Sequence, residues 1–133
     1  MAMDFDIVHA YEPVPQYGEC WHHNMTGRGN ARLHPLALGD KTDLVSLKAG
    51  KPGSSGETFV APKEQANAAF DVEIRMLDSF GLCGVDFIKI DCEGYEVFVI
   101  RGAEKTIRRE QPCIIVEQKT AWEKNTVSGK RTP

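Results

Sequence analysis

Long hydrophobic runs are missing from the sequence, and no apolar stretch approaches the roughly 18 residues that a membrane-spanning helix needs. The first residues carry acids and no basic segment, so they do not resemble a secretory signal peptide. Basic charge is also in short supply, because 16 lysines and arginines stand against 19 aspartates and glutamates, for a net charge of −3. Binding nucleic acid through its phosphates needs a basic surface. We therefore expect neither a membrane nor a nucleic acid as a partner.

Cysteine pairs and metal-ligand spacings are absent as well. The sequence has four cysteines, none of them in a CxxC pair: Cys20, Cys83, Cys92 and Cys113. It also has four histidines, which share no metal-ligand spacing: His9, His22, His23 and His34. We expect the cysteines to be small buried side chains in a reducing compartment, which makes the cytoplasm the default location. We expect no metal site built on these cysteines and histidines.

What the sequence does contain is typical of one globular domain over residues 1–133, with a hydrophobic fraction of 41% and a charged fraction of 26%. Apolar runs predict strands at residues 5–11, 31–38, 44–48, 58–61, 70–74, 85–90 and 113–116. Helical spacing predicts helices at residues 16–25 and 95–109, with a short helical turn at 77–80. Buried strands alternate with helices at both ends of the chain, around a β-rich insertion. This order predicts an α/β domain with a mostly parallel sheet.

The longer predicted helix, residues 95–109, carries one apolar stripe. Val97, Ile100, Ala103 and Ile107 recur at helical spacing, so we expect them to face the core. We expect one continuous helix that ends before the next proline.

Acidic residues follow three of the predicted core strands: Glu12, Asp91 and Glu117. In an open α/β sheet, ligands bind beyond the carboxyl ends of the strands, where loops converge and helix N-termini point. A carboxylate there offers two oxygens that can accept hydrogen bonds from two ribose hydroxyls. Glu12, in the segment AYEPVP, suits this role, and an ordinary loop acid is the alternative.

The segment KIDCEGYE places Asp91 and Glu93 close together, and Gly94 allows a sharp turn into the next helix. Two such carboxylates can bind a divalent cation, hold an acceptor hydroxyl or serve as a base. The alternative is that the acids of this segment only stabilise the N-terminus of the helix. Lys89 alternates with apolar neighbours in the preceding strand, which is unusual for a core position, and it is a candidate partner for one of the acids.

These segments together resemble the FkbM-type S-adenosylmethionine-dependent methyltransferases. The run VDFIKIDCEGYEVFVIRGAEKTIRREQPCIIVEQK is similar to the signature region of that family. Upstream, AYEPVPQ resembles its Glu-Pro-x-Pro segment, PLALGDKT its Ala-Leu-Gly-Asp turn, and IRMLDSF its Arg-Thr-Leu-Asp element. The four motifs occur in the order of the family and cover most of residues 11–119.

The resemblance implies a class I, Rossmann-like methyltransferase fold, with S-adenosylmethionine as methyl donor and a hydroxyl oxygen of a small molecule or sugar as acceptor. By position, Glu12 would bind the cofactor ribose and Ala37 would lie beside the adenine. Asp91 would act as the base, and Glu93 would orient the acceptor or bind a cation. Lys89 and Glu117 would lie on the acceptor side.

One part of the family pattern is missing. In the family a strand and a glycine-rich loop precede the Glu-Pro-x-Pro segment, but here only eleven residues precede Glu12 and none is glycine. We therefore expect a partial domain, incomplete at its N-terminus, that binds the cofactor weakly or not at all. The missing strand would stand between the strands that contain Ile7 and Ile88. These two strands would then either pair directly or leave an open edge that favours a homo-oligomer.

Two other functions stay open on the sequence alone. The chain could be a non-catalytic binding or assembly module that keeps the methyltransferase-like sheet. It could also hold a divalent metal at Asp91, Glu93 and Glu117 and use it for hydrolysis.

Overall fold

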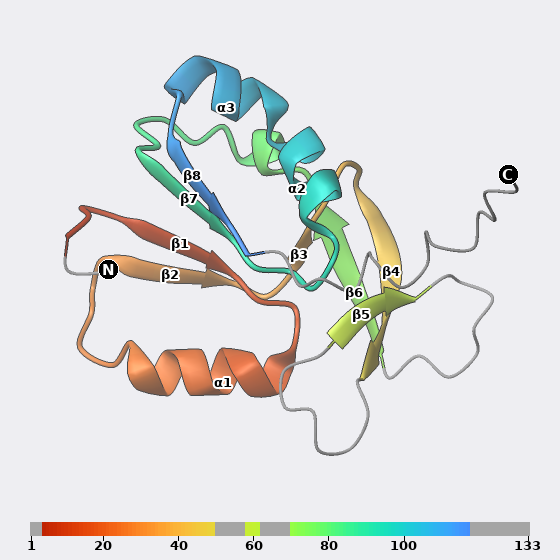
Figure 1. Cartoon of the computed structure of the whole chain (residues 1–133). Helices are drawn as coiled ribbons and strands as arrows, with labels where there is room; N and C mark the ends of the chain where they lie inside the picture. Colours follow the sequence, from red (N-terminus) through yellow and green to blue (C-terminus); the bar gives the residue numbers. More distant parts are fainter. Residues whose placement is uncertain (1–3, 50–57, 62–69, 118–133) are drawn as a thin grey trace, which may run out of the picture.

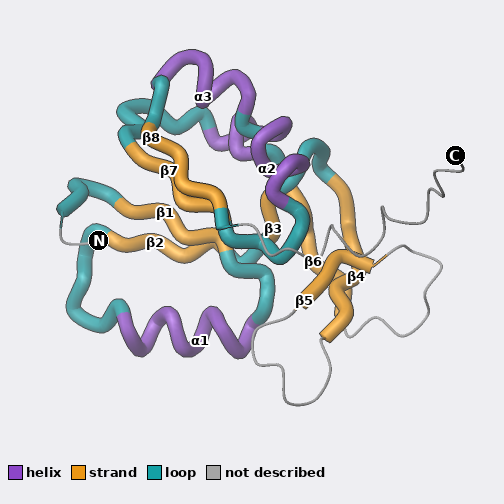
Figure 2. Tube along the Cα trace, viewed as in Figure 1, coloured by secondary structure: helices purple, strands orange, loops and turns teal. Residues whose placement is uncertain are grey.

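The computed structural model describes residues 4–49, 58–61 and 70–117. Within them the strands form three separate sheets, two of which have two parallel strands each and the third four strands. Figure 1 shows the two parallel pairs side by side, with one helix below them and two short helices above, and Figure 2 shows the four-stranded sheet beyond their ends. The structure is thus mixed α/β with parallel strand pairs, as predicted.

The N-terminal unit is a β–α–β arrangement: β1 (Val8–Tyr11), α1 (Pro15–Asn24) and β2 (Ala31–His34). β1 and β2 are parallel, with Val8 opposite Ala31. Proline at the first helical position starts α1, because it lacks an N–H that would be unpaired there. β1 is shorter than the predicted strand 5–11.

α1 packs on β2 through a glycine. Gly18 is buried, and a Cβ added to it would lie 3.3 Å from the Leu33 side chain. This close approach lets a short helix, 10 residues long, lie flat on the two strands.

The predicted β-rich insertion is confirmed as a sheet of order β3-β6-β4-β5. Its strands are β3 (Ala37–Leu38), β4 (Asp43–Ala49), β5 (Thr58–Ala61) and β6 (Phe70–Arg75). β6 is parallel to β3, and β4 is antiparallel to both of its neighbours. The alternation in β4 and β6 buries one face, which forms the main core cluster: Val14, Val45, Leu47, Val72 and Ile74. The predicted strand 31–38 is split, because Pro35 separates β2 from β3 and sends them into different sheets.

The C-terminal unit begins with the short 3-10 helix η1 (Leu77–Phe80), as predicted. It continues with β7 (Phe87–Ile90), α2 (Glu96–Gly102), α3 (Glu104–Glu110) and β8 (Cys113–Val116). β7 and β8 are parallel, with Phe87 opposite Cys113.

The single long helix predicted for residues 95–109 is wrong, because the chain breaks at Ala103 into α2 and α3. The predicted buried stripe is wrong for Val97 and Ile100, which are 53% and 37% exposed. The break turns α3 relative to α2, so a stripe drawn at continuous helical spacing does not stay on one side. The residues that are buried in the two helices are Glu96, Val99, Gly102, Ala103 and Thr106.

The cysteine expectation is also wrong. Cys20, Cys83 and Cys113 are exposed and Cys92 is half-buried. Cys113 begins β8, whose alternate residues are open to solvent, so this strand is not buried on both faces as its apolar sequence suggested. Among the described residues, no helix has the length and apolar character needed to cross a membrane.

Candidate functional site

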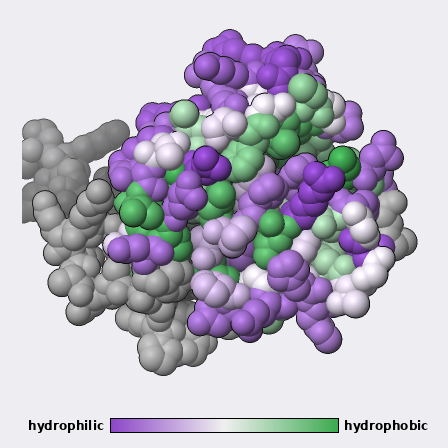
Figure 3. All heavy atoms as spheres, turned by 180° about the vertical axis from the view of Figure 1, so that it is seen from behind, coloured by the Kyte–Doolittle hydropathy of each residue, from purple (hydrophilic) through white to green (hydrophobic). Residues whose placement is uncertain are grey.

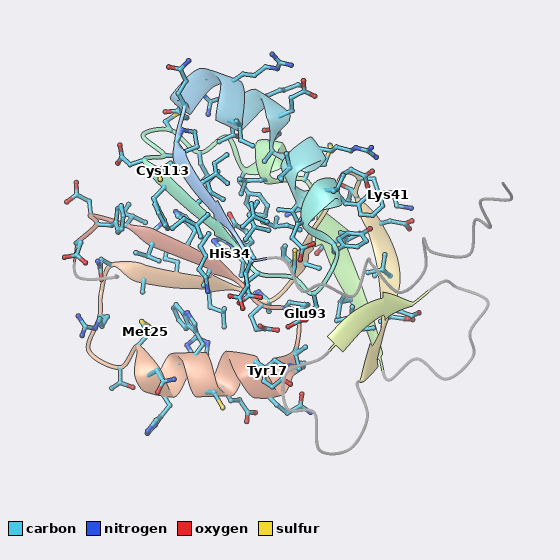
Figure 4. The ribbon with its side chains drawn as sticks, viewed as in Figure 1. Tyr17, Met25, His34, Lys41, Glu93 and Cys113 are labelled. Atoms are coloured by element: carbon cyan, nitrogen blue, oxygen red, sulfur yellow. The ribbon has the colours of Figure 1, made fainter. Side chains whose placement is uncertain are left out.

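A cleft of about 830 Å³ lies between β1 and β7 and reaches the loops that follow both strands. Five of the six residues predicted for a site line it: Glu12, Ala37, Lys89, Asp91 and Glu93. Glu117 is not part of the lining. In Figure 4, Glu93 lies near the carboxyl ends of the parallel strands, while Cys113 lies at their opposite ends. The structure thus brings predicted cofactor and catalytic positions to one rim, although they come from distant parts of the sequence.

Glu12 follows β1 and is half-buried at the cleft. Its Oε1 accepts a hydrogen bond of 2.8 Å from the Val14 backbone N–H. Burial raises the pKa of the Glu12 carboxyl, and the hydrogen bond from Val14 opposes this shift without cancelling it. The side chain is therefore oriented by the backbone and only partly hydrated, which is the setting of a ligand-binding carboxylate.

Lys89 connects the two acids at the ends of β7 and β8. Its Nζ lies 3.4 Å from Asp91 Oδ2 and 3.9 Å from Glu117 Oε2. All three side chains are between 39% and 54% exposed, so each pair stabilises the fold by at most about 1 kcal/mol. The predicted pairing of Lys89 with an acid is confirmed. Lys89 also pairs with Glu117, which does not line the cleft.

The turn after Asp91 has an uncommon backbone. Glu93 and Gly94 have φ angles of 52° and 99°, and the first of these is rare for a residue with a side chain. Gly94 N–H donates a 2.8 Å hydrogen bond to Oε1 of Glu96, which is only 6% exposed. Glu96 therefore stabilises the turn at the start of α2. This hydrogen bond assigns helix stabilisation to Glu96 among the acids of the segment.

The wall that contains Ala37 depends on two glycines in close contact. A Cβ added to Gly102 of α2 would lie 1.8 Å from the Gly39 carbonyl oxygen. A Cβ on Gly39 would lie 2.4 Å from the Ile74 side chain and 3.1 Å from the Tyr95 ring. These two glycines, from the PLALGDKT and Arg-Gly-Ala motifs, allow α2 to rest directly on the end of β3 and so place Tyr95 and Ala37 at the cleft.

Sequence reasoning missed an aromatic cluster under the cleft. His9 Nδ1 and His34 Nε2 are 2.9 Å apart, and Tyr11 stacks on His34 with ring centroids 4.7 Å apart. Phe80 of η1 meets the edge of both rings. Burial lowers the pKa of both histidines, and Arg32 lowers them further. The available signal was the alternation of His9 and Tyr11 on one strand face, but the register that adds His34 is not visible in the sequence.

Tyr11 also carries a buried hydroxyl. Its Oη has no hydrogen-bond partner among the described residues, and burial raises the Tyr11 pKa to about 12. An unpaired buried hydroxyl is costly unless a ligand or water completes it.

A three-carboxylate metal centre is not formed in the described part of the chain. No group of three or more His, Cys, Asp or Glu side chains there could hold a metal ion. Lys89 stands between Asp91 and Glu117, so its ammonium group takes the position that a cation would need.

With this geometry in place, a comparison with protein families matches residues 6–131 to the methyltransferase FkbM domain. The chain belongs to the FkbM methyltransferase family. The resemblance seen in the sequence is therefore confirmed. A search of curated proteins finds no match to this FkbM chain.

Among solved structures, the FkbM chain is similar to the crystal structure of the methyltransferase FkbM from Methylobacillus flagellatus KT, determined at 2.20 Å resolution. The TM-score is 0.54 and the sequence identity 19%, so this similarity concerns the fold. The alignment covers 84% of the present chain and 26% of that one. The chain thus spans about a quarter of the length of its structural relative.

The cleft residues fit the nucleoside end of S-adenosylmethionine, the cofactor that the family resemblance implies. The volume of the cleft, about 830 Å³, lies within the range of about 300–1,000 Å³ that small-molecule sites occupy. Glu12 has carboxylate oxygens for ribose hydroxyls, and Ala37 contributes a small apolar side chain to the lining. No glycine-rich loop lies beside Glu12 among residues 4–49 and 70–117, so the methionine end has no such backbone cradle there.

Proposed function

We propose that this chain takes part in S-adenosylmethionine-dependent methyl transfer to a hydroxyl oxygen of a small molecule or sugar, on a class I, Rossmann-like sheet. The observation that carries the proposal is the convergence of Glu12, Ala37, Asp91 and Glu93 on one cleft at the carboxyl ends of parallel strands. Membership of a methyltransferase family supports it.

Glu12 and Ala37 would hold the cofactor. The Glu12 carboxylate is fixed by Val14 N–H and still has acceptor capacity for two ribose hydroxyls. Ala37 would form the small wall beside the adenine, in the position that the Gly39–Gly102 contact fixes.

When bound, S-adenosylmethionine supplies an electrophilic methyl group on a positively charged sulfur. The residues of this chain then have to orient the acceptor and remove its proton. Asp91 would take the hydroxyl proton at Oδ1, because Oδ2 is the oxygen that faces Lys89 at 3.4 Å. Glu93 would orient the acceptor or bind a cation, and Lys89 with Glu117 would contact the acceptor.

A second function is supported by a different observation. β1 and β7 flank the cleft without pairing with each other, so both present open backbone edges in the described structure. A binding or assembly module would use these edges and would need no cofactor.

Calorimetric titration of the purified chain with S-adenosylmethionine tests the first function. We expect weak binding, because the described residues include no glycine-rich loop beside Glu12. Glu12→Ala should weaken it about tenfold or more, since a hydrogen-bonded charged group contributes about 1.5–3 kcal/mol. Glu19→Ala, an exposed acid on α1, is the matched control. Equal affinity of the wild-type chain and Glu12→Ala would contradict the ribose assignment.

A further inference from the structure

Four side chains project from the face of the β1–β2 pair that is opposite α1: His9, Tyr11, Arg32 and His34. The register sets His9 opposite Arg32 and Tyr11 opposite His34, and opposite residues of neighbouring strands point to the same face. Leu33, at an alternate position of β2, points to the other face, where it packs on α1. In Figure 4, His34 accordingly lies on the side of the strands away from α1. We call these four residues the basic face.

The two histidines form a hydrogen-bonded pair that leaves one nitrogen of each ring outside it. His9 Nδ1 and His34 Nε2 lie 2.9 Å apart, and the ring planes differ by 17°. The outer nitrogens, Nε2 of His9 and Nδ1 of His34, have no hydrogen-bond partner among the described residues. Whichever ring donates within the neutral pair, one of the two outer nitrogens carries an N–H. The neutral pair therefore always offers one donor to a ligand, and a protonated pair offers two.

The charge of the basic face is not balanced by an acid in the described structure. Arg32 is exposed and forms no ion pair with any described residue. Burial and Arg32 lower the pKa of both histidines, and no carboxylate of the described residues contributes to either shift. An acid near the rings would have raised their pKa. The face therefore combines the positive charge of Arg32 with the donors of the histidine pair.

Aromatic side chains close one side of the basic face. Tyr11 stacks on His34 with ring centroids 4.7 Å apart, and Phe80 of η1 meets the edges of both rings. Such a wall reduces contact with water, and charged hydrogen bonds are stronger where water is excluded. Tyr11 Oη is buried and has no partner in the part of the chain that is described. An oxygen atom of a ligand would complete this hydroxyl.

α3 carries more arginines than the basic face, but their charges are balanced. Arg108 Nη2 lies 2.8 Å from Glu104 Oε1, and Arg109 pairs with Glu110. Seen from behind, hydrophilic residues gather over this helix at the top of the molecule (Figure 3). Both signs of charge occur there as pairs, which is typical of a solvated helix surface. Arg32 lacks such a partner among the described residues, and this distinguishes the basic face.

The donors of the basic face match a phosphate group. Arg32 has a fork of N–H groups that suits phosphate oxygens, the histidine pair adds an imidazole N–H, and Tyr11 adds a hydroxyl. A phosphate has enough terminal oxygens to accept from all three, and its charge of about −1.5 to −2 at pH 7 pairs with Arg32. A metal cation does not fit, because the inner nitrogens of the histidines face each other and Arg32 repels positive charge.

We propose that the basic face of β1 and β2 binds a phosphate group, either the free ion or a phosphate ester of a small molecule. Arg32 would pair with its charge, and the histidine pair and Tyr11 would donate hydrogen bonds to its oxygens. The inference goes beyond the proposed function, because it uses none of the acids at the rim and requires neither S-adenosylmethionine nor methyl transfer.

NMR titration of the full chain at low salt, in a buffer that contains no phosphate, tests this proposal. Three probes are compared: inorganic phosphate, β-glycerophosphate and glycerol. The two phosphate probes should shift the ring signals of His9 and His34. They should also raise the pKa of at least one of these rings by about 1, because a nearby anion favours the protonated imidazole. His22 and His23, exposed on α1, should change much less, and glycerol should shift none of the four.

Two variants locate the bound group. Arg32→Gln removes the unbalanced charge and should weaken binding of both phosphate probes about tenfold or more. Arg28→Gln, at an exposed arginine before β2, is the matched control and should not weaken it. Tyr11→Phe keeps the stack on His34, removes only the hydroxyl and should weaken binding about three- to tenfold. Because Arg32 is exposed, its replacement should leave the fold intact, and the His9 and His34 signals of the unbound variant check this.

The two phosphate probes distinguish the sources of the ligand. Tighter binding of β-glycerophosphate assigns the basic face to a phosphate ester, and equal or tighter binding of inorganic phosphate assigns it to the free ion. Both results support the proposal.

Four results would overturn the inference: no binding of either phosphate probe, equal binding of glycerol, equal effects of Arg28→Gln and Arg32→Gln, or similar shifts of all four histidines. Arg32→Gln should leave the titration with S-adenosylmethionine unchanged. Failure of the cofactor assignment and failure of this inference are therefore separate results.

Discussion

Glu12 is a residue at which stability and the proposed function oppose each other. Burial raises its pKa in the folded protein above the ordinary value of 4.5. For an acid with a raised folded-state pKa, the ionised form is disfavoured in the fold, so stability falls as the pH rises through that pKa. Glu12→Gln removes the charge and keeps an oxygen for Val14 N–H. We expect this variant to be more stable than the wild type at pH 7.

The pH dependence separates this effect from a packing effect. Below pH 4.5 the carboxyl is protonated in both the folded and unfolded chains, so the difference between Glu12→Gln and wild type should vanish. Urea unfolding of both proteins at pH 7 and at pH 4 measures this difference in the free energy of unfolding. A stability gain of equal size at both pH values would show that burial of the charge is not its source.

The His9–His34 pair predicts a loss of stability in weak acid. Burial and Arg32 lower the pKa of both rings from 6.5, and His9, whose Nδ1 lies 2.9 Å from His34 Nε2, lowers the pKa of His34 further. The unfolded chain binds these protons first, so the free energy of unfolding should fall as the pH drops below about 6.5. His34→Gln should reduce this loss, and His23→Gln, on an exposed part of α1, should leave it in place.

At the scale of single residues, the sequence predicted contacts between residues that are close along the chain. It missed contacts that depend on how two strands are aligned. Lys89 and Asp91 are two residues apart at the end of one strand, so their pairing followed from the pattern. His9 and His34 are 25 positions apart, and only the alignment of β1 with β2 brings them together. The left-handed backbone of Glu93 was equally hidden, because Gly94 alone signalled the turn.

At the scale of the elements, the contact between Gly102 of α2 and Gly39, directly after β3, leaves no room for a side chain on Gly102. Gly102→Ala would place a Cβ 1.8 Å from the Gly39 carbonyl oxygen, which is backbone and cannot rotate away. We expect this variant to lower the free energy of unfolding by about 1–3 kcal/mol or more. Gly29→Ala is the control, since a Cβ there meets nothing within 4 Å. Similar thermal midpoints for the two variants would contradict the packing argument.

Asp78 ties η1 to α3. Its two carboxylate oxygens accept hydrogen bonds of 3.0 and 2.8 Å from the backbone N–H groups of Lys105 and Thr106, in the first turn of α3. Burial opposes ionisation, but these bonds outweigh it and lower the pKa of Asp78. Asp78→Ala should therefore cost about 0.5–2 kcal/mol, as loss of a helix cap does.

The control for Asp78 lies in the same helix. Glu104→Ala removes only the exposed pair with Arg108, which stabilises a helix by about 0.5 kcal/mol at most. Because a lowered acid pKa stabilises the fold only while the group is ionised, the Asp78→Ala difference should shrink as the pH falls below 3.8. An effect that persists in acid would indicate lost packing.

The sequence predicted most of the helices and strands, but it did not predict where they are interrupted. The alternation of Val45, Leu47, Val72 and Ile74 marked β4 and β6, and the structure buries that face. The break between α2 and α3 depends on Gly102 pressing against β3 and on Asp78 reaching α3 from outside. Both partners are distant in sequence, so a continuous helical period gave no sign of the break.

At the scale of the whole molecule, the sequence indicated that acids from separate strands would share one edge of the structure, because parallel strands end together. Glu12 and Asp91 do line one cleft. The sequence also left two arrangements open for the strands around Ile7 and Ile88, and direct pairing is wrong in the described structure, where β1 pairs with β2 alone. Local patterns specify which residues form strands, but they do not specify the spacing between two edges.

Because β1 and β7 do not pair in the described structure, the chain should not unfold in one step. In the described structure no strand pairing joins the β1–α1–β2 unit to the other sheets. Side-chain contacts connect it to them, such as that between Phe5 and Phe87, whose ring centroids are 6.0 Å apart. Two-stranded units are marginal when isolated, so this unit should melt at a lower denaturant concentration than the four-stranded sheet. Filling the gap would merge the two melting steps into one cooperative transition.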